Sequence, residues 1–357
     1  MLAWGFFLLS AILIATMMAN HTRIWAAIGW MLLAAIPGRA QTAPATPPAP
    51  APAVAPAVAP AKPGVALVEF HDDLGRLVRL PAAPQRIVSL APSLTETVFA
   101  LELGNRLAGV TDFCDYPPEA LTRPRVGGPI NPNLEQIVSL HPDVVLATRA
   151  MNRRETVEAL ERLGIPVYAT DARTVDDVIA STRRLGKVLG AQARGDSLAA
   201  GMEQRLAELA RRLAGRPPRR VFFVVWTDPI ISTGPHTFLA DALHRAGAES
   251  VVTVAQDWPQ ISIEEVLRQN PDYLVFSGTH PDDPQSAINS LQKRPGWSSL
   301  EAVRERHYAV VSDALDRPAP RLLDAIEDLA RQLHPEAFPA TPASKPREPG
   351  NRRGGRL

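Results

Sequence analysis

One segment occurs twice in the chain, and this repetition constrains the fold more than any other feature of the sequence. Residues 131–147 read NPNLEQIVSLHPDVVLA, and residues 260–277 read QISIEEVLRQNPDYLVFS. Matching Glu135 with Glu264, 129 positions later, also superimposes the Pro-Asp pair that follows in each copy. Each copy has apolar residues at helical spacing, a proline that stops the helix and an apolar strand after it. The repetition predicts two related lobes.

The rest of the body continues this alternation of strands and helices. A hairpin is expected around His71–Gly75, followed by a buried strand and a helix that Ser93 caps, with Glu96 completing a capping box. The region after Thr174 is purely helical, and 193–214 reads as one helix about 30 Å long. The strand and helix pattern then restarts. We therefore predict an α/β fold: two Rossmann-like lobes with central, mainly parallel sheets, joined by one long α-helix.

Composition sets the boundaries of this body. Residues 1–40 contain two apolar runs, Leu2–Ala19 and Ile24–Ile36, followed by Gly38 and Ala40. They indicate a signal peptide or, alternatively, an uncleaved N-terminal hydrophobic anchor. Residues 41–64 form an Ala/Pro-rich linker, and residues 339–357 form a basic tail expected to be disordered. The folded body is 65–338, with an N-lobe of about 65–185, a linking helix of about 191–214 and a C-lobe of about 218–338.

Charge and cysteine content exclude some classes of function. The termini are basic, with +3 on residues 1–64 and +4 on residues 339–357, so a total of +1 leaves −6 on the body. An acidic body does not suit nucleic acid, whose phosphates require a basic surface. Cys114 is the only cysteine, so no intramolecular disulfide forms, and we read it as a small buried residue.

Several motifs occur together in a fixed order: PQRIVSLAPSLTE, DYPPEA, GGPINPNLE, the long helix and WPQIS. In this combination the chain resembles class III substrate-binding proteins of ABC importers, the cobalamin and iron-siderophore periplasmic-binding family, and most closely its cobalamin-binding branch. The resemblance extends from about Val68 to His334. It implies a monomeric, periplasmic receptor that captures a corrinoid between its lobes and delivers it to an ABC permease in the inner membrane. It implies no enzymatic activity and no cofactor besides the transported ligand.

The resemblance gives the repeated glutamates a role. In this family one surface glutamate on each lobe meets arginines of the permease, and the matching residues are Glu135 and Glu264. From the residues alone, both carboxylates occupy the second position of a helix that Asn133 or Ser262 begins. There they also interact favourably with the helix dipole, which is the alternative explanation for them.

Six residues are candidates for ligand contact. The resemblance implies this role for Phe113, Asp313 and Arg317, although the last two also suit a surface pair four residues apart. Trp226, at the end of a predicted strand, and Trp258 lie in loops expected to face the ligand, where tryptophan is common. Tyr116 is the sixth candidate, with the alternative that it fixes the turn before two prolines.

The identity of the ligand stays open at this level. Pro129 and Thr148 stand where the cobalamin binders that we compare carry tryptophan, so haem or a ferric siderophore remains an alternative to a corrinoid. We assign no metal site, since His236 and His280 read as isolated loop residues. A secreted enzyme is the rival class, but the sequence has no GxxxxGK[ST], GxSxG, HExxH or CxxC motif.

Overall fold

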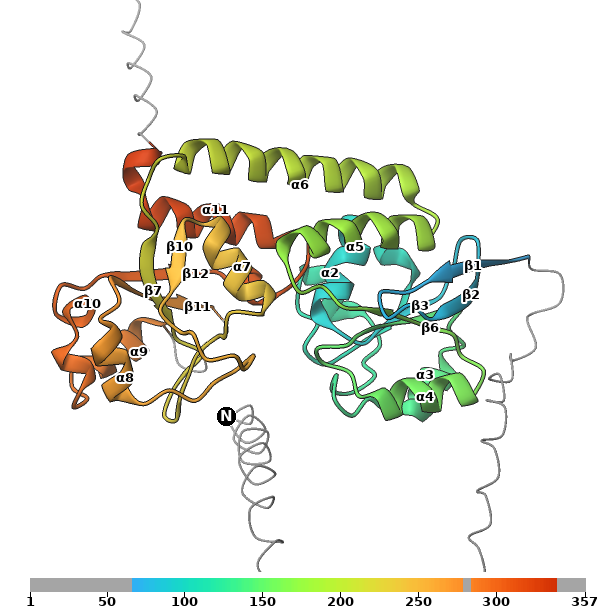
Figure 1. The fold of residues 1–357 in the computed structure, drawn as a ribbon. Helices are drawn as coiled ribbons and strands as arrows, with labels where there is room; N and C mark the ends of the chain where they lie inside the picture. Colours follow the sequence, from blue (N-terminus) through green and yellow to red (C-terminus); the bar gives the residue numbers. More distant parts are fainter. Residues whose placement is uncertain (1–65, 279–283, 339–357) are drawn as a thin grey trace, which may run out of the picture. The chain divides into compact units, whose positions relative to one another are not determined.

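The computed structural model describes residues 66–278 and 284–338, all within one compact unit, Ala55–Leu357. The expected signal segment, the linker, the tail and His280 therefore lie outside the described residues. The described part contains two α/β lobes, each built on a four-stranded parallel sheet (Figure 1). The predicted fold class is confirmed.

The first lobe begins with an antiparallel hairpin and continues into a sheet of order β4-β3-β5-β6. Its strands are β1 (Leu67–His71), β2 (Leu77–Pro81), β3 (Ile87–Ser89), β4 (Leu107–Val110), β5 (Val144–Thr148) and β6 (Val167–Thr170). Its helices are α2 (Pro92–Ala100), α3 (Leu134–Ser139) and α4 (Arg154–Arg162). Successive residues of β5 enter two separate apolar cores, because alternate side chains of a strand point to opposite faces.

The second lobe repeats this plan with a sheet of order β10-β7-β11-β12. Its strands are β7 (Arg219–Phe223), β8 (Trp226–Thr227), β9 (Ile230–Ile231), β10 (Ala248–Ser250), β11 (Tyr273–Ser277) and β12 (Tyr308–Val311). Its helices are α7 (Phe238–Arg245), α8 (Ile263–Gln269), α9 (Pro284–Leu291), α10 (Glu301–Arg304) and α11 (Leu322–Leu333). The strands β8 and β9 form a small antiparallel hairpin that the sequence did not predict.

The sequence repeat corresponds to a structural repeat. Strands β5 and β11 have bounds that differ by the same 129 positions as the two glutamates. The aspartate before each strand accepts a backbone N–H bond from the start of the neighbouring central strand: Asp143 from Arg86 at 3.0 Å, and Asp272 from Arg220 at 2.9 Å. The Pro-Asp pair thus ends a helix and fixes the alignment of the next strand in both lobes.

Two helices connect the lobes, α5 (Val175–Val188) and α6 (Gln192–Leu213). The first part of α5 and most of α6 pack in the core of the second lobe, whereas the last turn of α5 packs in the core of the first. Their backbones lie close together at two glycines, where a Cβ on Gly186 would lie 2.7 Å from the Cα of Gly195. The long helix expected at about 191–214 is present as α6, and α5 packs tightly against it.

The capping box predicted for α2 is wrong. The residue that precedes this helix is Ala91, and no side chain caps it. Ser93 and Glu96 both lie within the helix and are buried. Glu96 has other partners, which come from the opposite lobe.

Candidate functional site

A buried carboxylate receives two arginines at the junction of the lobes. Glu96, on α2 of the first lobe, has a side chain that is 3% exposed. Arg317 donates to its Oε1 at 2.8 Å, and Arg321 donates to Oε2 at 3.0 Å and to Oε1 at 2.9 Å. Both arginines belong to the segment that leads into α11 in the second lobe. The bonds satisfy a charge that would be costly to bury alone.

Asp313 completes the arrangement from the second lobe. Arg321 donates to its two oxygens at 2.9 and 3.1 Å, and the nearest atoms of Arg317 and Asp313 lie 3.0 Å apart. Burial raises the pKa of the Asp313 carboxyl, but the hydrogen bonds from Arg321 and the charges of both arginines outweigh burial, so the pKa lies below its ordinary value. Asp313 is therefore held in the ionised form.

Two residues of the first lobe's loop after β4 extend the group toward solvent. Arg317 donates to Asp115 Oδ1 at 2.7 Å, and Asp115 is 58% exposed. The guanidinium of Arg321 lies 4.0 Å from the ring centre of Tyr116, which is a cation–π contact. We call Glu96, Asp115, Asp313, Arg317 and Arg321 the interlobe charge cluster.

The structure brings together three of the six predicted ligand residues: Tyr116, Asp313 and Arg317. Asp313 and Arg317, which are four residues apart, do pair with each other, but they belong to this cluster and are not an isolated surface pair. Sequence reasoning missed Arg321 and the partners of Glu96. A usable signal was the spacing of the two arginines in RPAPR, which places both guanidiniums within one short segment.

The other three candidates are Phe113, Trp226 and Trp258, which are not members of this cluster. Phe113 is 46% exposed and Trp258 is 53% exposed, so both residues present apolar surface to solvent. Trp226 was expected to end a buried strand. It instead lies beyond β7 and begins the hairpin strand β8. Its Nε1 donates to the carbonyl oxygen of Asp228 at 2.7 Å.

The repeated glutamates are both exposed and both lie in the first turn of a helix. The cap itself is made by the preceding side chain: Asn133 accepts from the backbone N–H of Gln136, and Ser262 accepts from that of Glu265. Within residues 66–278 and 284–338, neither Glu135 nor Glu264 forms an ion pair or a side-chain hydrogen bond. Their carboxylates are thus not needed as caps.

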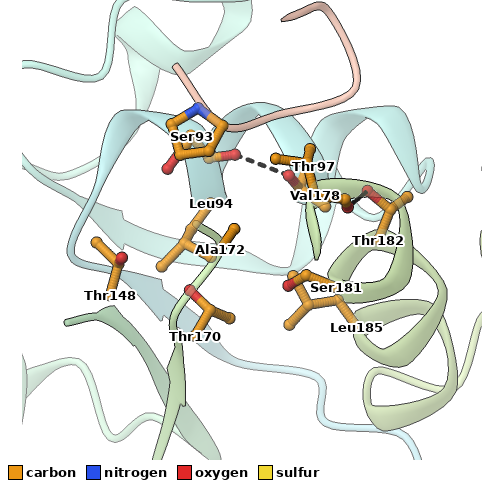
Figure 2. A pocket seen from close by; sticks show the side chains of 11 residues that line it. Ser93, Leu94, Thr97, Thr148, Thr170, Ala172, Val178, Ser181, Thr182 and Leu185 are labelled. Atoms are coloured by element: carbon orange, nitrogen blue, oxygen red, sulfur yellow. Dashed lines mark hydrogen bonds between the residues drawn. The ribbon is translucent and has the colours of Figure 1, made fainter. Parts of the chain in front are cut away.

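Two hollows in the described part of the chain are lined by residues other than the predicted ligand contacts. The smaller one, about 10 Å³, suits a single water and is rich in hydroxyls from α2, α5, β5 and β6 (Figure 2). The larger one, about 720 Å³, lies between α6 and α11 and is lined by ion-paired arginines and glutamates.

Two features are absent from the residues that the structure describes. Within them, no helix is long and apolar enough to span a bilayer. No three of their His, Cys, Asp or Glu side chains are grouped so as to hold a metal ion.

The sequence matches known proteins along most of the body. Residues 87–314 match the family model for periplasmic binding proteins. A vitamin B12-binding protein of Vibrio cholerae is 31% identical over 259 residues, which cover 72% of this chain and 92% of the relative. An ABC transporter substrate-binding lipoprotein of Bacillus subtilis is 33% identical over 279 residues, 76% of this chain and 87% of the relative.

Solved structures agree with these matches. The periplasmic vitamin B12-binding protein of Vibrio cholerae superimposes with a TM-score of 0.65 at 30% identity, covering 72% of this chain and 99% of that one. A periplasmic heme-binding protein of Roseiflexus superimposes with a TM-score of 0.63 at 29% identity, covering 71% of this chain and 99% of that one. Proteins that bind different ligands thus have this fold in common.

Proposed function

The chain belongs to the periplasmic binding protein family and is a substrate-binding protein of the ABC-importer type, and on this premise we propose that its ligand is a corrinoid. Proteins of this family are transport proteins rather than enzymes, and they carry transported ligands rather than cofactors. We also place the protein in the periplasm, where it delivers the ligand to an inner-membrane permease. This location is part of the proposal.

The arrangement of the predicted contacts supports a corrinoid as the ligand. Predicted contacts from both lobes, Tyr116 from the first and Asp313 and Arg317 from the second, meet in one group. Exposed aromatic side chains at Phe113 and Trp258 supply apolar surface. A corrinoid is a large ring with polar groups at its edge, and such a ligand requires flat apolar contacts together with a few fixed polar groups. The vitamin B12-binding relatives favour the same reading.

Haem is the second candidate. Heme-binding proteins occur among the structural neighbours, and Pro129 and Thr148 depart from the aromatic pattern of cobalamin binders. Pro129 and Thr148 are both buried and neither is aromatic, so neither offers an aromatic face to a ligand.

Calorimetric titration of the full chain distinguishes these ligands. The titrants are cyanocobalamin, dicyanocobinamide, haem and a ferric hydroxamate. We expect saturable binding of at least one of the two corrinoids and weaker or no binding of the others. Saturation by haem or by the ferric hydroxamate, with no heat from either corrinoid, would refute the proposal.

We further propose that Glu135 and Glu264 contact the permease. The two exposed carboxylates occupy equivalent positions in the two lobes, and neither is engaged by its own lobe's described residues. Charges placed in this way determine the orientation and the rate of encounter of two proteins.

A further inference from the structure

Residues 211–220 are strongly basic within an otherwise acidic body. They read RRLAGRPPRR, with five arginines and no acidic residue. Because these five charges belong to a body that carries −6, the remainder of the body carries −11. Neither the candidate ligand contacts nor the repeated glutamates use this segment, so its charge has no role in the function described so far.

The structure places this segment beside the start of the basic tail. Residues 211–220 span the last turn of α6, the loop after it and the first residues of β7. The guanidinium of Arg212 lies 5.6 Å from the ring centre of Phe338, and the ends of α6 and α11 lie together (Figure 1). Phe338 is followed directly by residues 339–357, which carry +4. Two basic segments that are far apart in the sequence thus meet at one end of the second lobe.

The arginines at this end outnumber the carboxylates that pair with them. Arg211 and Arg212 share Glu208, and the guanidiniums of Arg216 and Arg219 lie 3.8 and 3.9 Å from Glu336. Arg220 faces Glu249 across the sheet and is left out. The other four are exposed, from 31% at Arg216 to 77% at Arg211. We call the following residues the basic end, which has an excess of two positive charges: Arg211, Arg212, Arg216 and Arg219.

This excess lies outside the neighbouring groove between α6 and α11. The groove contains three arginines, and each of them pairs with an acidic side chain. The pairs are Arg205 with Asp324 and Glu327, Arg212 with Glu208, and Arg331 with Glu327. An acidic peptide in the groove would therefore find no surplus charge. The surplus is instead spread over an exposed helix end, a loop and the adjoining tail.

We propose that the basic end, together with residues 339–357, binds the surface of an anionic phospholipid membrane. Guanidinium groups bind phosphate oxygens through two N–H donors at once, and they need no fitted cavity to do so. An array of anionic headgroups attracts each basic residue that comes near it, so charge spread over several segments contributes additively. The proposal does not depend on the identity of the transported ligand.

Sedimentation with lipid vesicles tests this proposal on the full chain. One set of vesicles is phosphatidylcholine, and the other is an equal mixture of phosphatidylcholine and phosphatidylglycerol. The apolar runs of residues 1–40 meet the same hydrocarbon in both sets, so the difference in partition coefficient reports charge. We expect partition onto the anionic vesicles to be at least about tenfold stronger. Added salt should weaken it, because exposed charges are screened.

Arg211→Gln combined with Arg216→Gln should lower the partition onto anionic vesicles about tenfold. Glu208 keeps Arg212 and Glu336 keeps Arg219 in this variant, so no carboxylate is left without its partner. A thermal melt checks that the variant is folded.

Arg79→Gln combined with Arg154→Gln is the matched control. It removes the same charge from two exposed ion pairs of the first lobe and should leave the partition unchanged. In a third variant, Arg352, Arg353 and Arg356 are replaced with glutamine, which reduces the charge of the tail and should weaken partition onto the anionic vesicles.

Three outcomes would overturn the proposal. The first is equal partition of the wild-type chain onto both sets of vesicles. The second is a loss of partition that the control variant shares, which would mean that only net charge matters. The third is binding of a polyglutamate peptide with no preference for anionic vesicles, which would indicate an acidic protein as the partner.

Discussion

Glu96 and Arg321, which are 225 positions apart in the sequence, are joined by hydrogen bonds of 3.0 and 2.9 Å that link the first lobe to the second. The carboxylate is almost fully buried, with 3% of its side chain exposed, so these arginines replace the hydrogen bonds that water would otherwise supply. This contact connects the stability of the chain to the geometry of the candidate ligand site, since Arg321 also holds Asp313 and covers Tyr116.

Glu96→Ala should be strongly destabilising. It leaves two poorly exposed guanidiniums without their shared acceptor, and removal of one partner from a buried ion pair costs about 3–5 kcal/mol. Urea unfolding measures the loss. Glu158→Ala is the matched control, because Glu158 pairs with Arg154 at the surface, and it should cause no measurable change. A similar result for both variants would contradict the buried pairing.

Asp313 should make stability depend on pH in the acid range. Its folded-state pKa lies below the ordinary value of 3.8, so the stability that it contributes is fully present above pH 3.8 and is lost as the pH falls through the lower pKa. The difference in unfolding free energy between wild type and Asp313→Asn should therefore shrink below pH 3.8. Urea unfolding at a series of pH values tests this expectation. A difference in unfolding free energy that grows as the pH falls would mean that the pKa of Asp313 is raised in the folded state.

Gly195→Ala should destabilise the helical connection. The new Cβ would lie 2.9 Å from the Cα of Gly186, and overpacking of this kind costs about 1–3 kcal/mol. Gly201→Ala in the same helix meets nothing within 4 Å and should stabilise by up to about 1 kcal/mol. Thermal unfolding compares the two, and stabilisation by both substitutions would be inconsistent with close packing of α5 and α6.

Replacing Glu135 and Glu264 together with alanine should abolish transport and leave ligand affinity unchanged. The physical reason is that both carboxylates are exposed and unengaged within the described residues, so their loss affects only a partner. Uptake of ligand by cells and calorimetry of the purified variant measure the two properties separately.

Glu155→Ala is the control for docking. Glu155 is exposed and lies in the first turn of α4, so it occupies the same kind of helix position without belonging to the repeated pair. It should leave uptake intact. Normal uptake by the double variant would refute the docking proposal.

Local sequence patterns predicted most of the fold because the relevant forces act over a few residues. The Pro-Asp pairs and the apolar runs after them located β5 and β11, and Asn133 was correctly identified as a cap. Glu96 shows where this reasoning failed. Its spacing from Ser93 fits a capping box, yet its partners lie more than 220 positions away, and no local pattern reports contacts of that range.

The candidate site was predictable only in part for the same reason. Asp313 and Arg317 were found through the family's motif, and their spacing explains their mutual contact. Trp226 was misplaced because an apolar run does not show where a strand ends and a hairpin begins. Its indole donates to the carbonyl oxygen of Asp228, within the turn between β8 and β9.

The aspartates that precede β5 and β11 allow the sheet of one lobe to be weakened by a substitution that does not touch the other lobe. Asp143 secures only the first sheet and Asp272 only the second, by the same bond to a backbone N–H. Substituting one of them loosens one half of the receptor and leaves the other as an internal reference. The duplicated bond thus offers a means of weakening one lobe at a time and comparing the effects on ligand binding.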